Sequence, residues 1–279
     1  MQPYSFAGGT ALLTGAAGGI GSNLARGLAR RGSHLALFDI NETGLAAVAG
    51  EIRAAHPDLT VTTDTHDLTD DAALDAAVER FRVEHAPLTL LVNNAGVALG
   101  GRFDQISTAD VDWVMRVNFH APMRLTHALL PDLLATPGSH LVNVSSLFGL
   151  IAPEGQTAYA ASKFALRGLT EALRHELTPR GVAVSIVHPG GVRTGIAANA
   201  RMGAGVSEED VSKHRHIWEK ALVLDPAVAA EIILTGVQRR QPRIVVGLDA
   251  KVPDVVARVL PGSYGPWLAR ATEMVVRLR

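Results

Sequence analysis

A tyrosine and a lysine four residues apart have the types and spacing needed for proton transfer. Tyr159 and Lys163 occur in the stretch "YAASK", and a helix there would carry both side chains on one face. A free tyrosine has a pKa of about 10, and a neighbouring ammonium group favours its phenolate. The pair could therefore act as a general acid or base near neutral pH. The alternative is a surface tyrosine stacked over a lysine stem.

A second group of residues suggests phosphate binding. The stretch "TGAAGGIG" places Gly15, Gly19 and Gly21 where an apolar run turns into a helical pattern. Glycines there let a pyrophosphate approach the backbone and the helix N-terminus, although such a turn could also serve only close packing. Asp39 ends the next apolar run, about 20 residues further on, where a ribose hydroxyl would be held. Asp39 could instead cap the next helix, but Asn41 could also do so. The combination favours a dinucleotide site.

Asp39 also indicates which dinucleotide is bound. A carboxylate accepts hydrogen bonds from ribose hydroxyls and repels a 2′-phosphate. The glycine turn contains no Arg or Lys, and Ile40 rather than a basic residue follows Asp39. The predicted cofactor is therefore NAD rather than NADP.

The elements that must position these residues alternate between strand and helix patterns. The alternation predicts βαβ units, and hence an α/β fold with a parallel sheet covered by helices on both faces. We expect one domain over residues 1–279, with a polar substrate lid at 195–221 and a helical C-terminal extension at 250–279. Strands are predicted at Ala11–Thr14, Leu35–Phe38, Leu59–Thr63, Leu88–Val92, Leu141–Val144, Val182–Val187 and Ile244–Val246. Helices are predicted at Ile20–Arg31, Ala73–Val83, Asp110–Leu134 and Ala158–Leu177.

Composition excludes several classes of function. The 279 residues are 47% hydrophobic with a net charge of −1, which suits one large core and argues against a nucleic-acid binder. The chain has no cysteine, so it has neither disulfides nor thiolate metal sites. His214 and His216 have the wrong spacing for a metal site on one helical face. Without a signal-peptide pattern or a long apolar segment, we expect a cytoplasmic protein.

Taken together, these motifs resemble the short-chain dehydrogenase/reductase family, which has a doubly wound, mostly seven-stranded Rossmann fold. The glycine turn matches the family pattern T-G-x-x-x-G-x-G, and "YAASK" matches its catalytic Tyr and Lys. Further segments match in the family's order and cover nearly the whole chain to about Gly247. They are Asp67-Leu68, "NNAG" at Asn93–Gly96, Asn118 in "MRVNFHAP", Ser146 in "NVSSLFG" and the segment "HPGGVRT".

The resemblance implies a role for each matched residue. Tyr159 is the general acid or base, Lys163 lowers its pKa and holds the nicotinamide ribose, and the hydroxyl of Ser146 donates to the substrate oxygen. Asn118 would anchor a water that links Lys163 to solvent. Ser145 is excluded because its side chain would point to the opposite face of the strand. The implied cofactor contacts are Gly15, Gly19, Ile20, Gly21, Asp39, Asp67, Leu68, Asn94, Gly96, Tyr159, Lys163, Pro189, Gly190, Val192 and Thr194.

The substrate is expected to be a mainly apolar alcohol or ketone. An apolar run, 147–152, follows Ser146, and Val97 and Leu99 could extend this wall. No basic residue stands there to hold an acid, although Arg193 lies close in sequence, and Glu154 or Gln156 could supply one polar contact. The alternative function is a non-catalytic NAD(H) sensor or scaffold, which usually lacks Tyr, Lys or Ser. An epimerase or lyase would need a larger C-terminal domain.

The tail departs from the family pattern. Apolar residues between Trp267 and Leu278 recur at helical spacing, opposite several charged residues. Such a helix could pack on its own domain or cover the active site, could form a dimer interface, or could lie on a membrane surface. We expect a homodimer or homotetramer, and a dimer through the two long predicted helices, Asp110–Leu134 and Ala158–Leu177.

Overall fold

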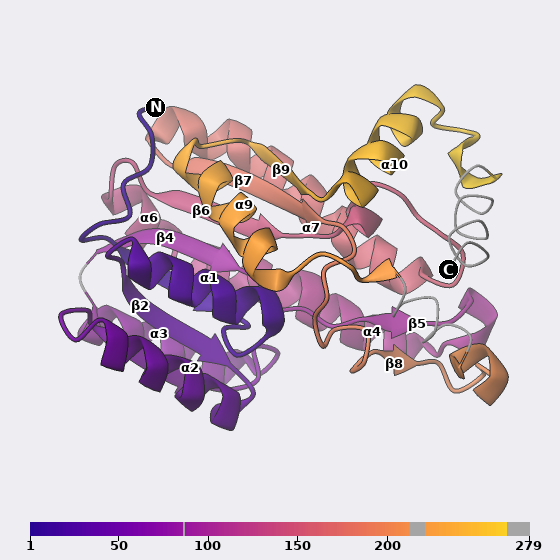
Figure 1. Cartoon of the computed structure of the whole chain (residues 1–279), viewed down its shortest axis with the longest axis horizontal. Coiled ribbons are helices and arrows are strands. Elements are labelled where there is room, and N and C mark those ends of the chain that lie inside the picture. The colour runs from indigo at the N-terminus through magenta and orange to yellow at the C-terminus, as the bar shows by residue number, and fades with distance from the viewer. Residues whose placement is uncertain (86, 213–220, 267–279) are drawn as a thin grey trace.

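The computed structural model describes residues 1–85, 87–212 and 221–266. Its centre is a seven-stranded parallel sheet in the order β3-β2-β1-β4-β6-β7-β9 (Figure 1). The strands are β1 (Thr10–Thr14), β2 (His34–Asp39), β3 (Val61–Thr65), β4 (Leu88–Asn93), β6 (His140–Val144), β7 (Ala183–Pro189) and β9 (Arg243–Val246). The α/β fold and all seven predicted strands are confirmed.

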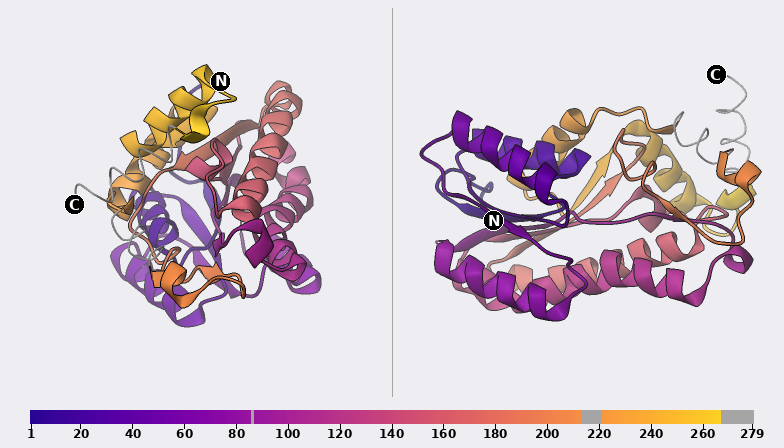
Figure 2. Two further views of the ribbon diagram at one scale, coloured as in Figure 1. Left: turned by 90° about the vertical axis from the view of Figure 1, so that its right-hand side faces the viewer. Right: turned by 90° about the horizontal axis from the view of Figure 1, so that it is seen from below.

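Helices cover both faces of the sheet (Figure 2). One apolar layer combines the sheet with α1 (Gly19–Arg30), α2 (Glu42–Ala55) and α9 (Pro226–Gln238). The other combines it with α3 (Asp71–Glu84), α5 (Ala121–Ala128), α6 (Leu130–Ala135) and α7 (Thr157–Leu177). Strands β1, β6 and β7 are buried along their whole length, which explains why they read as continuous apolar runs.

The long helix predicted over Asp110–Leu134 is wrong as a single element. The structure has α4 (Thr108–Met115), a π-helical turn over Arg116–His120, and then α5 and α6. Proline explains both interruptions, since it has no N–H for the carbonyl four residues earlier. Pro122 follows the π-helical turn at the start of α5, and Pro131 stands at the start of α6. The first interruption falls at Asn118, a predicted site residue.

A small second sheet joins two loops near the carboxyl end of the main sheet. Its strands are β5 (Leu99–Gly100) and β8 (Arg201–Met202), which pair in parallel. The guanidinium of Arg201 lies 3.8 Å from the ring centre of Trp113 and forms an ion pair with Asp110 of α4. The first part of the predicted lid is therefore fastened to α4 and β5.

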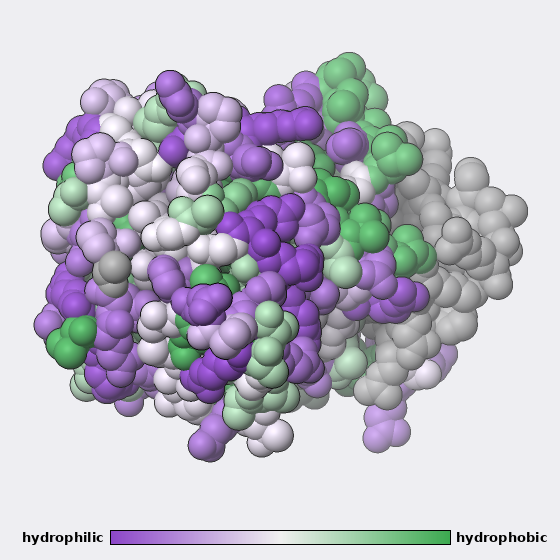
Figure 3. All heavy atoms as spheres, turned by 60° about the vertical axis from the view of Figure 1, so that its left-hand side comes forward, coloured by the Kyte–Doolittle hydropathy of each residue, from purple (hydrophilic) through white to green (hydrophobic). Residues whose placement is uncertain are grey.

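The described C-terminal part is helical, as expected. Helix α10 (Leu248–Val259) follows β9 and lies apart from the α1/α9 layer (Figure 1). Several of its apolar side chains are exposed, and apolar and polar residues are mixed over the face shown in Figure 3. Within the described residues, no helix is both long enough and apolar enough to cross a membrane. The tail helix predicted from Trp267 onward lies outside the described residues.

Candidate active site

The glycine turn packs directly on the end of β4. Gly15 has a φ of +67°, and a Cβ there would lie 2.8 Å from Cα of Ala95, so a side chain would be both strained and obstructed. The amide Nδ2 of Asn94 donates to the carbonyls of Thr14 and Gly15 at 3.1 Å each. The hydroxyl of Thr14 accepts from the N–H groups of Asn94 and Ala95. These bonds fix the turn against the predicted "NNAG" segment.

The turn ends at a helix N-terminus that suits an anion. Gly18 caps α1 without any side-chain hydrogen bond, and the first turn contains no acidic residue. Free N–H groups and the positive end of the helix dipole can therefore face a phosphate. A Cβ on Gly19 would lie 2.7 Å from Cγ2 of Thr194. The predicted phosphate and nicotinamide segments thus meet at Gly19, and the residues present fit a dinucleotide. Ile20 and Gly21 lie in the first turn of the same helix.

Asp39 lies beside the turn, as the sequence predicts. Its Oδ2 accepts from the N–H of Ala17 at 2.8 Å, and its Oδ1 accepts from the N–H of Asn41 at 2.9 Å. Asn41 caps α2 through Gly44, so the capping alternative for Asp39 is wrong. Asp39 therefore positions the turn as well as adding negative charge. Ile40 is 69% exposed.

The predicted adenine-contacting pair lies at the neighbouring strand end. Asp67 is exposed, and its Oδ1 accepts from the N–H and hydroxyl of Thr69 at 2.8 Å each. Leu68 is half-buried and borders a small space with Thr14 and Asn93. Both residues lie near the carboxyl end of the sheet, on the same side as the glycine turn.

The structure brings Ser146, Tyr159 and Lys163 together. Tyr159 is 6% exposed and Lys163 is 3% exposed, and Nζ of Lys163 lies 5.8 Å from the tyrosine ring centre. Burial raises the pKa of Tyr159, and a hydrogen bond with Ser146 acts in the opposite direction. Burial also lowers the pKa of Lys163 to about 8. The net effect is that the pKa of Tyr159 is raised. The expectation that Lys163 lowers the pKa of Tyr159 therefore stays a prediction.

Asn118 is a buried residue of the π-helical turn that links this turn to α7 and to the loop after β4. Its Oδ1 accepts from the N–H of Val97 at 2.9 Å, and its Nδ2 donates to the Val97 carbonyl and to Oγ of Ser162. Pro122 offers no N–H to the Asn118 carbonyl, so this oxygen could accept a hydrogen bond from a water. A Cβ on Gly96 would lie 3.1 Å from both Asn118 Oδ1 and Lys163 Nζ. The predicted water itself stays a prediction.

Ser145 and His188 lie close to the predicted site residues, and each makes a hydrogen bond to a backbone carbonyl. Oγ of Ser145 donates to the carbonyl of Lys163 at 3.0 Å and is buried, consistent with its exclusion as the catalytic serine. His188 is fully buried, and its Nδ1 lies 2.9 Å from the carbonyl oxygen of Ser146. Burial lowers the pKa of His188 to about 4, so the ring is neutral and holds the Ser146 backbone by a hydrogen bond.

The predicted nicotinamide segment follows β7 and is held by a residue that the sequence analysis missed. Pro189 ends β7, and Val192 pairs with Leu224 in an isolated bridge. A carboxylate oxygen of Asp249 accepts from the N–H of Gly191, and a Cβ on Gly190 would collide with that carboxylate. The only sequence signal for Asp249 was its place in the first turn of α10.

The substrate side is mainly apolar where it adjoins Tyr159. The ring of Phe148 meets that of Tyr159 edge-on, with centroids 6.1 Å apart. Tyr159 also belongs to an apolar cluster with Leu99 and Ala158, and Val97 packs against it. Of the two predicted polar contacts, Glu154 is exposed and Gln156 is buried.

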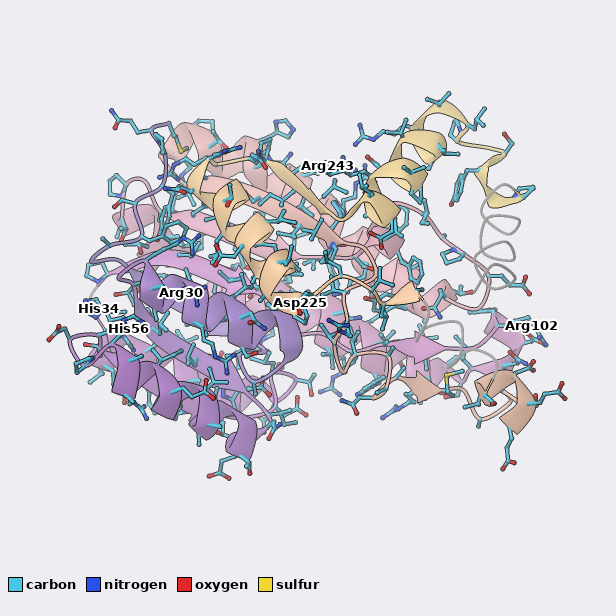
Figure 4. The ribbon with its side chains drawn as sticks, in the orientation of Figure 1. Arg30, His34, His56, Arg102, Asp225 and Arg243 are labelled. Atoms are coloured by element: carbon cyan, nitrogen blue, oxygen red, sulfur yellow. The ribbon has the colours of Figure 1, made fainter. Side chains whose placement is uncertain are left out.

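Arg193 has an acidic partner, and the described residues contain no metal-ligand cluster. Arg193 forms an ion pair with Asp225, and both side chains are exposed. Asp225 lies at the start of α9 (Figure 4). No cluster of metal-ligating side chains occurs within residues 1–85, 87–212 and 221–266. His214 and His216 lie outside the described residues.

Comparisons with known proteins agree with this geometry. The family model for short chain dehydrogenase matches residues 9–204. The chain is 40% identical over 267 residues to "Putative oxidoreductase SadH" of Mycobacterium tuberculosis, covering 93% of this chain and 94% of that protein.

Two solved structures of the same family show similar folds. A short chain dehydrogenase/reductase from Burkholderia phymatum in complex with NAD has a TM-score of 0.83 at 28% identity, covering 91% of this chain and 94% of that one. A short-chain dehydrogenase from Sphingobium yanoikuyae in complex with NADPH has a TM-score of 0.75 at 30% identity, with the same coverages. Relatives thus bind either dinucleotide. This chain belongs to the short-chain dehydrogenase/reductase family and is an NAD(P)-dependent oxidoreductase.

Proposed function

We propose that the protein interconverts a mainly apolar secondary alcohol and its ketone, with NAD(H) as the preferred cofactor. The observation that carries this proposal is the grouping of half-buried Ser146 with buried Tyr159 and Lys163, bordered by Phe148 and Leu99. A half-buried apolar wall stabilises substrate carbon, and burying a charged substrate group against that wall without a partner would be costly.

The preference for NAD is supported by Asp39. Its carboxylate lies at the glycine turn, and the exposed residue that follows it, Ile40, carries no positive charge. A 2′-phosphate placed there would meet like charge, whereas ribose hydroxyls can donate to the carboxylate.

The bound cofactor would supply the hydride chemistry. Tyr159 removes the hydroxyl proton when an alcohol is oxidised and returns a proton to the oxygen when a ketone is reduced. Ser146 donates a hydrogen bond to the same oxygen and stabilises the charge that develops there. His188 holds the Ser146 backbone through its carbonyl, and Lys163 places positive charge beside Tyr159. Thr194 and the N-terminus of α1 position the cofactor.

Turnover by the purified protein tests this function directly. We expect NAD-dependent oxidation of apolar secondary alcohols, followed by the absorbance of the reduced cofactor, and slower reaction with NADP. Tyr159→Phe should lower kcat by roughly 10²–10⁴-fold, since one positioned acid or base contributes about that much. Cofactor affinity should change little in this variant. Equal activity of Tyr159→Phe and the wild type would refute the assigned role.

The non-catalytic alternative predicts a different result. A sensor or scaffold would bind NADH and show no turnover on any alcohol or ketone. The presence of Ser146 beside buried Tyr159 and Lys163 favours the enzyme. The homodimer or homotetramer stays a prediction, for which sedimentation of the full chain is the measurement.

A further inference from the structure

Gln156 stands at the start of the helix that carries Tyr159. It is the N-cap residue of α7, and its carbonyl accepts from the N–H of Ala160 at 2.7 Å. Its side chain makes no capping hydrogen bond, and Gln is not among the residues that helices prefer at this position. Helix capping therefore does not explain the residue. Gln156 directly precedes the first turn of α7, three residues before Tyr159 in the chain.

The side chain of Gln156 is buried with an unsatisfied oxygen. The residue is 5% exposed, and its Oε1 is buried with no hydrogen-bond partner in the described part of the chain. Buried polar atoms are nearly always paired, because leaving one unpaired is costly. An unpaired amide next to a catalytic tyrosine is readily explained if a ligand completes it.

The surroundings of the amide place it between the helix of Tyr159 and the lid. A Cβ on Gly100 of β5 would lie 3.9 Å from Nε2 of Gln156 and 2.8 Å from Sδ of Met202 in β8. The Gly101 N–H donates to the carbonyl of Gly155 at 3.0 Å, which ties the segment before Gln156 to the same ribbon. The amide is thus held where the β5–β8 ribbon adjoins the first turn of α7.

We propose that Gln156 is a specificity-determining residue that binds a second hydroxyl group of the substrate. The substrate would be an otherwise apolar secondary alcohol or ketone that carries another hydroxyl away from the reacting carbon. That hydroxyl would donate to Oε1 of Gln156 while Ser146 and Tyr159 hold the reacting oxygen. A neutral hydroxyl suits a neutral amide, because neither group brings an uncompensated charge into an apolar site. This inference rests on the proposed function.

The physical consequence is discrimination between matched substrates. A mono-alcohol would leave Oε1 unpaired, whereas the dihydroxy compound satisfies it. Because an unpaired buried polar group is costly, kcat/KM for the dihydroxy compound should exceed that for the mono-alcohol by roughly 5- to 150-fold.

The test compares pairs of apolar secondary alcohols with and without a second hydroxyl, placed at successive carbons. We expect the wild type to prefer the dihydroxy member by roughly 5- to 150-fold at one particular spacing. Gln156→Met should bring this ratio close to one. Glu176→Gln is the control, because Glu176 is exposed near the other end of the same helix, and it should keep the wild-type ratio. A wild-type ratio near one at every spacing overturns the proposal, as does a preference that survives Gln156→Met.

A binding measurement separates this inference from the proposed function. Tyr159→Phe loaded with NAD is titrated with the same pairs in a calorimeter, so that no turnover is required. Tighter binding of the dihydroxy member supports the role of Gln156 even if no alcohol in the panel is oxidised. Equal binding of both members overturns that role, even if oxidation of simple alcohols supports the proposed function.

Discussion

At the residue scale, the carboxylate of Asp39 both accepts a hydrogen bond from the glycine turn and adds a negative charge. One substitution can separate these two effects. Asp39→Asn keeps an oxygen that can accept from the Ala17 N–H but removes the negative charge. We expect the ratio of kcat/KM for NAD over NADP to fall by roughly tenfold or more, because like-charge repulsion typically costs several kcal/mol. Steady-state kinetics with both cofactors measure this ratio. An unchanged ratio would mean that another residue selects the cofactor.

Asp39→Ala is the companion variant because it removes the acceptor as well as the charge. It should also loosen the glycine turn and weaken binding of both cofactors. If both variants weaken NAD and NADP equally, Asp39 positions the turn without selecting between them.

The buried ammonium of Lys163 predicts a pH dependence. Burial lowers its pKa to about 8, so the group is charged below that pH and loses its charge above it. The pKa of Tyr159 is raised, so the phenol stays protonated over the same range. Ketone reduction should therefore be constant below about pH 8 and decline above it. The measurement is kcat/KM for reduction between about pH 6 and 9.5.

Lys163→Arg provides the control for this profile, since its guanidinium stays charged throughout. The variant should be slower, yet its kcat/KM for reduction should not decline above pH 8. A wild-type profile without any decline would show that the charge of Lys163 is not required.

At the element scale, two neighbouring strands carry buried neutral histidines. His140 of β6 is fully buried, with Nε2 2.7 Å from Oγ of Ser185, and burial lowers its pKa to about 3. In the unfolded chain its pKa returns to about 6.5. Between these values the unfolded chain binds a proton that the folded protein does not. The free energy of unfolding should therefore fall as the pH drops from about 6.5, by about 1.4 kcal/mol per pH unit for each such histidine.

His140→Gln tests this dependence through the slope of the free energy of unfolding against pH, not through the stability at one pH. Urea unfolding at several pH values between about 4 and 6.5 gives the free energy of unfolding for both proteins. The variant should lose about 1.4 kcal/mol per pH unit less than the wild type, whatever its stability at neutral pH. Parallel curves would show that His140 is protonated in the folded state.

The elements also show what sequence patterns can and cannot predict. Apolar runs identified the seven strands of the main sheet because parallel strands buried on both faces have that composition. The interruption of the predicted helix at Asn118 had a local cause in Pro122, which periodicity alone overlooks. The paired strands β5 and β8 are only two residues long and have no detectable period.

The same limit applies to the site. Local motifs predicted Ser146, Tyr159, Lys163 and the glycine turn, because the residues of each motif are close together in the sequence. The contact of Asp249 with Gly191 joins residues 58 positions apart, and the burial of Gln156 depends on β5 and β8. This contact and this burial follow from tertiary packing, so no local sequence motif predicts them.

At the scale of the whole molecule, the cofactor site joins the two ends of the chain's main fold. The glycine turn belongs to the first βα unit, whereas Thr194 follows β7, and the two meet at Gly19. A ligand bound across this junction binds only the folded protein and should stabilise it as a unit. At an NAD concentration of about 100 times its Kd, the gain is about 2.7 kcal/mol. For a chain of this size, that gain corresponds to a rise in Tm of roughly 5 °C.

Gly19→Ala should abolish most of this rise. Its Cβ would lie 2.7 Å from Cγ2 of Thr194, so the two segments would have to separate and the phosphate contacts at α1 would weaken. Gly50→Ala is the matched control, because a Cβ at that position in α2 meets nothing within 4 Å. That variant should keep the NAD-induced rise in Tm, and alanine should slightly stabilise its helix. A full NAD-induced rise in Gly19→Ala would place the cofactor away from this junction, and the predicted roles of Gly19 and Thr194 would then be wrong.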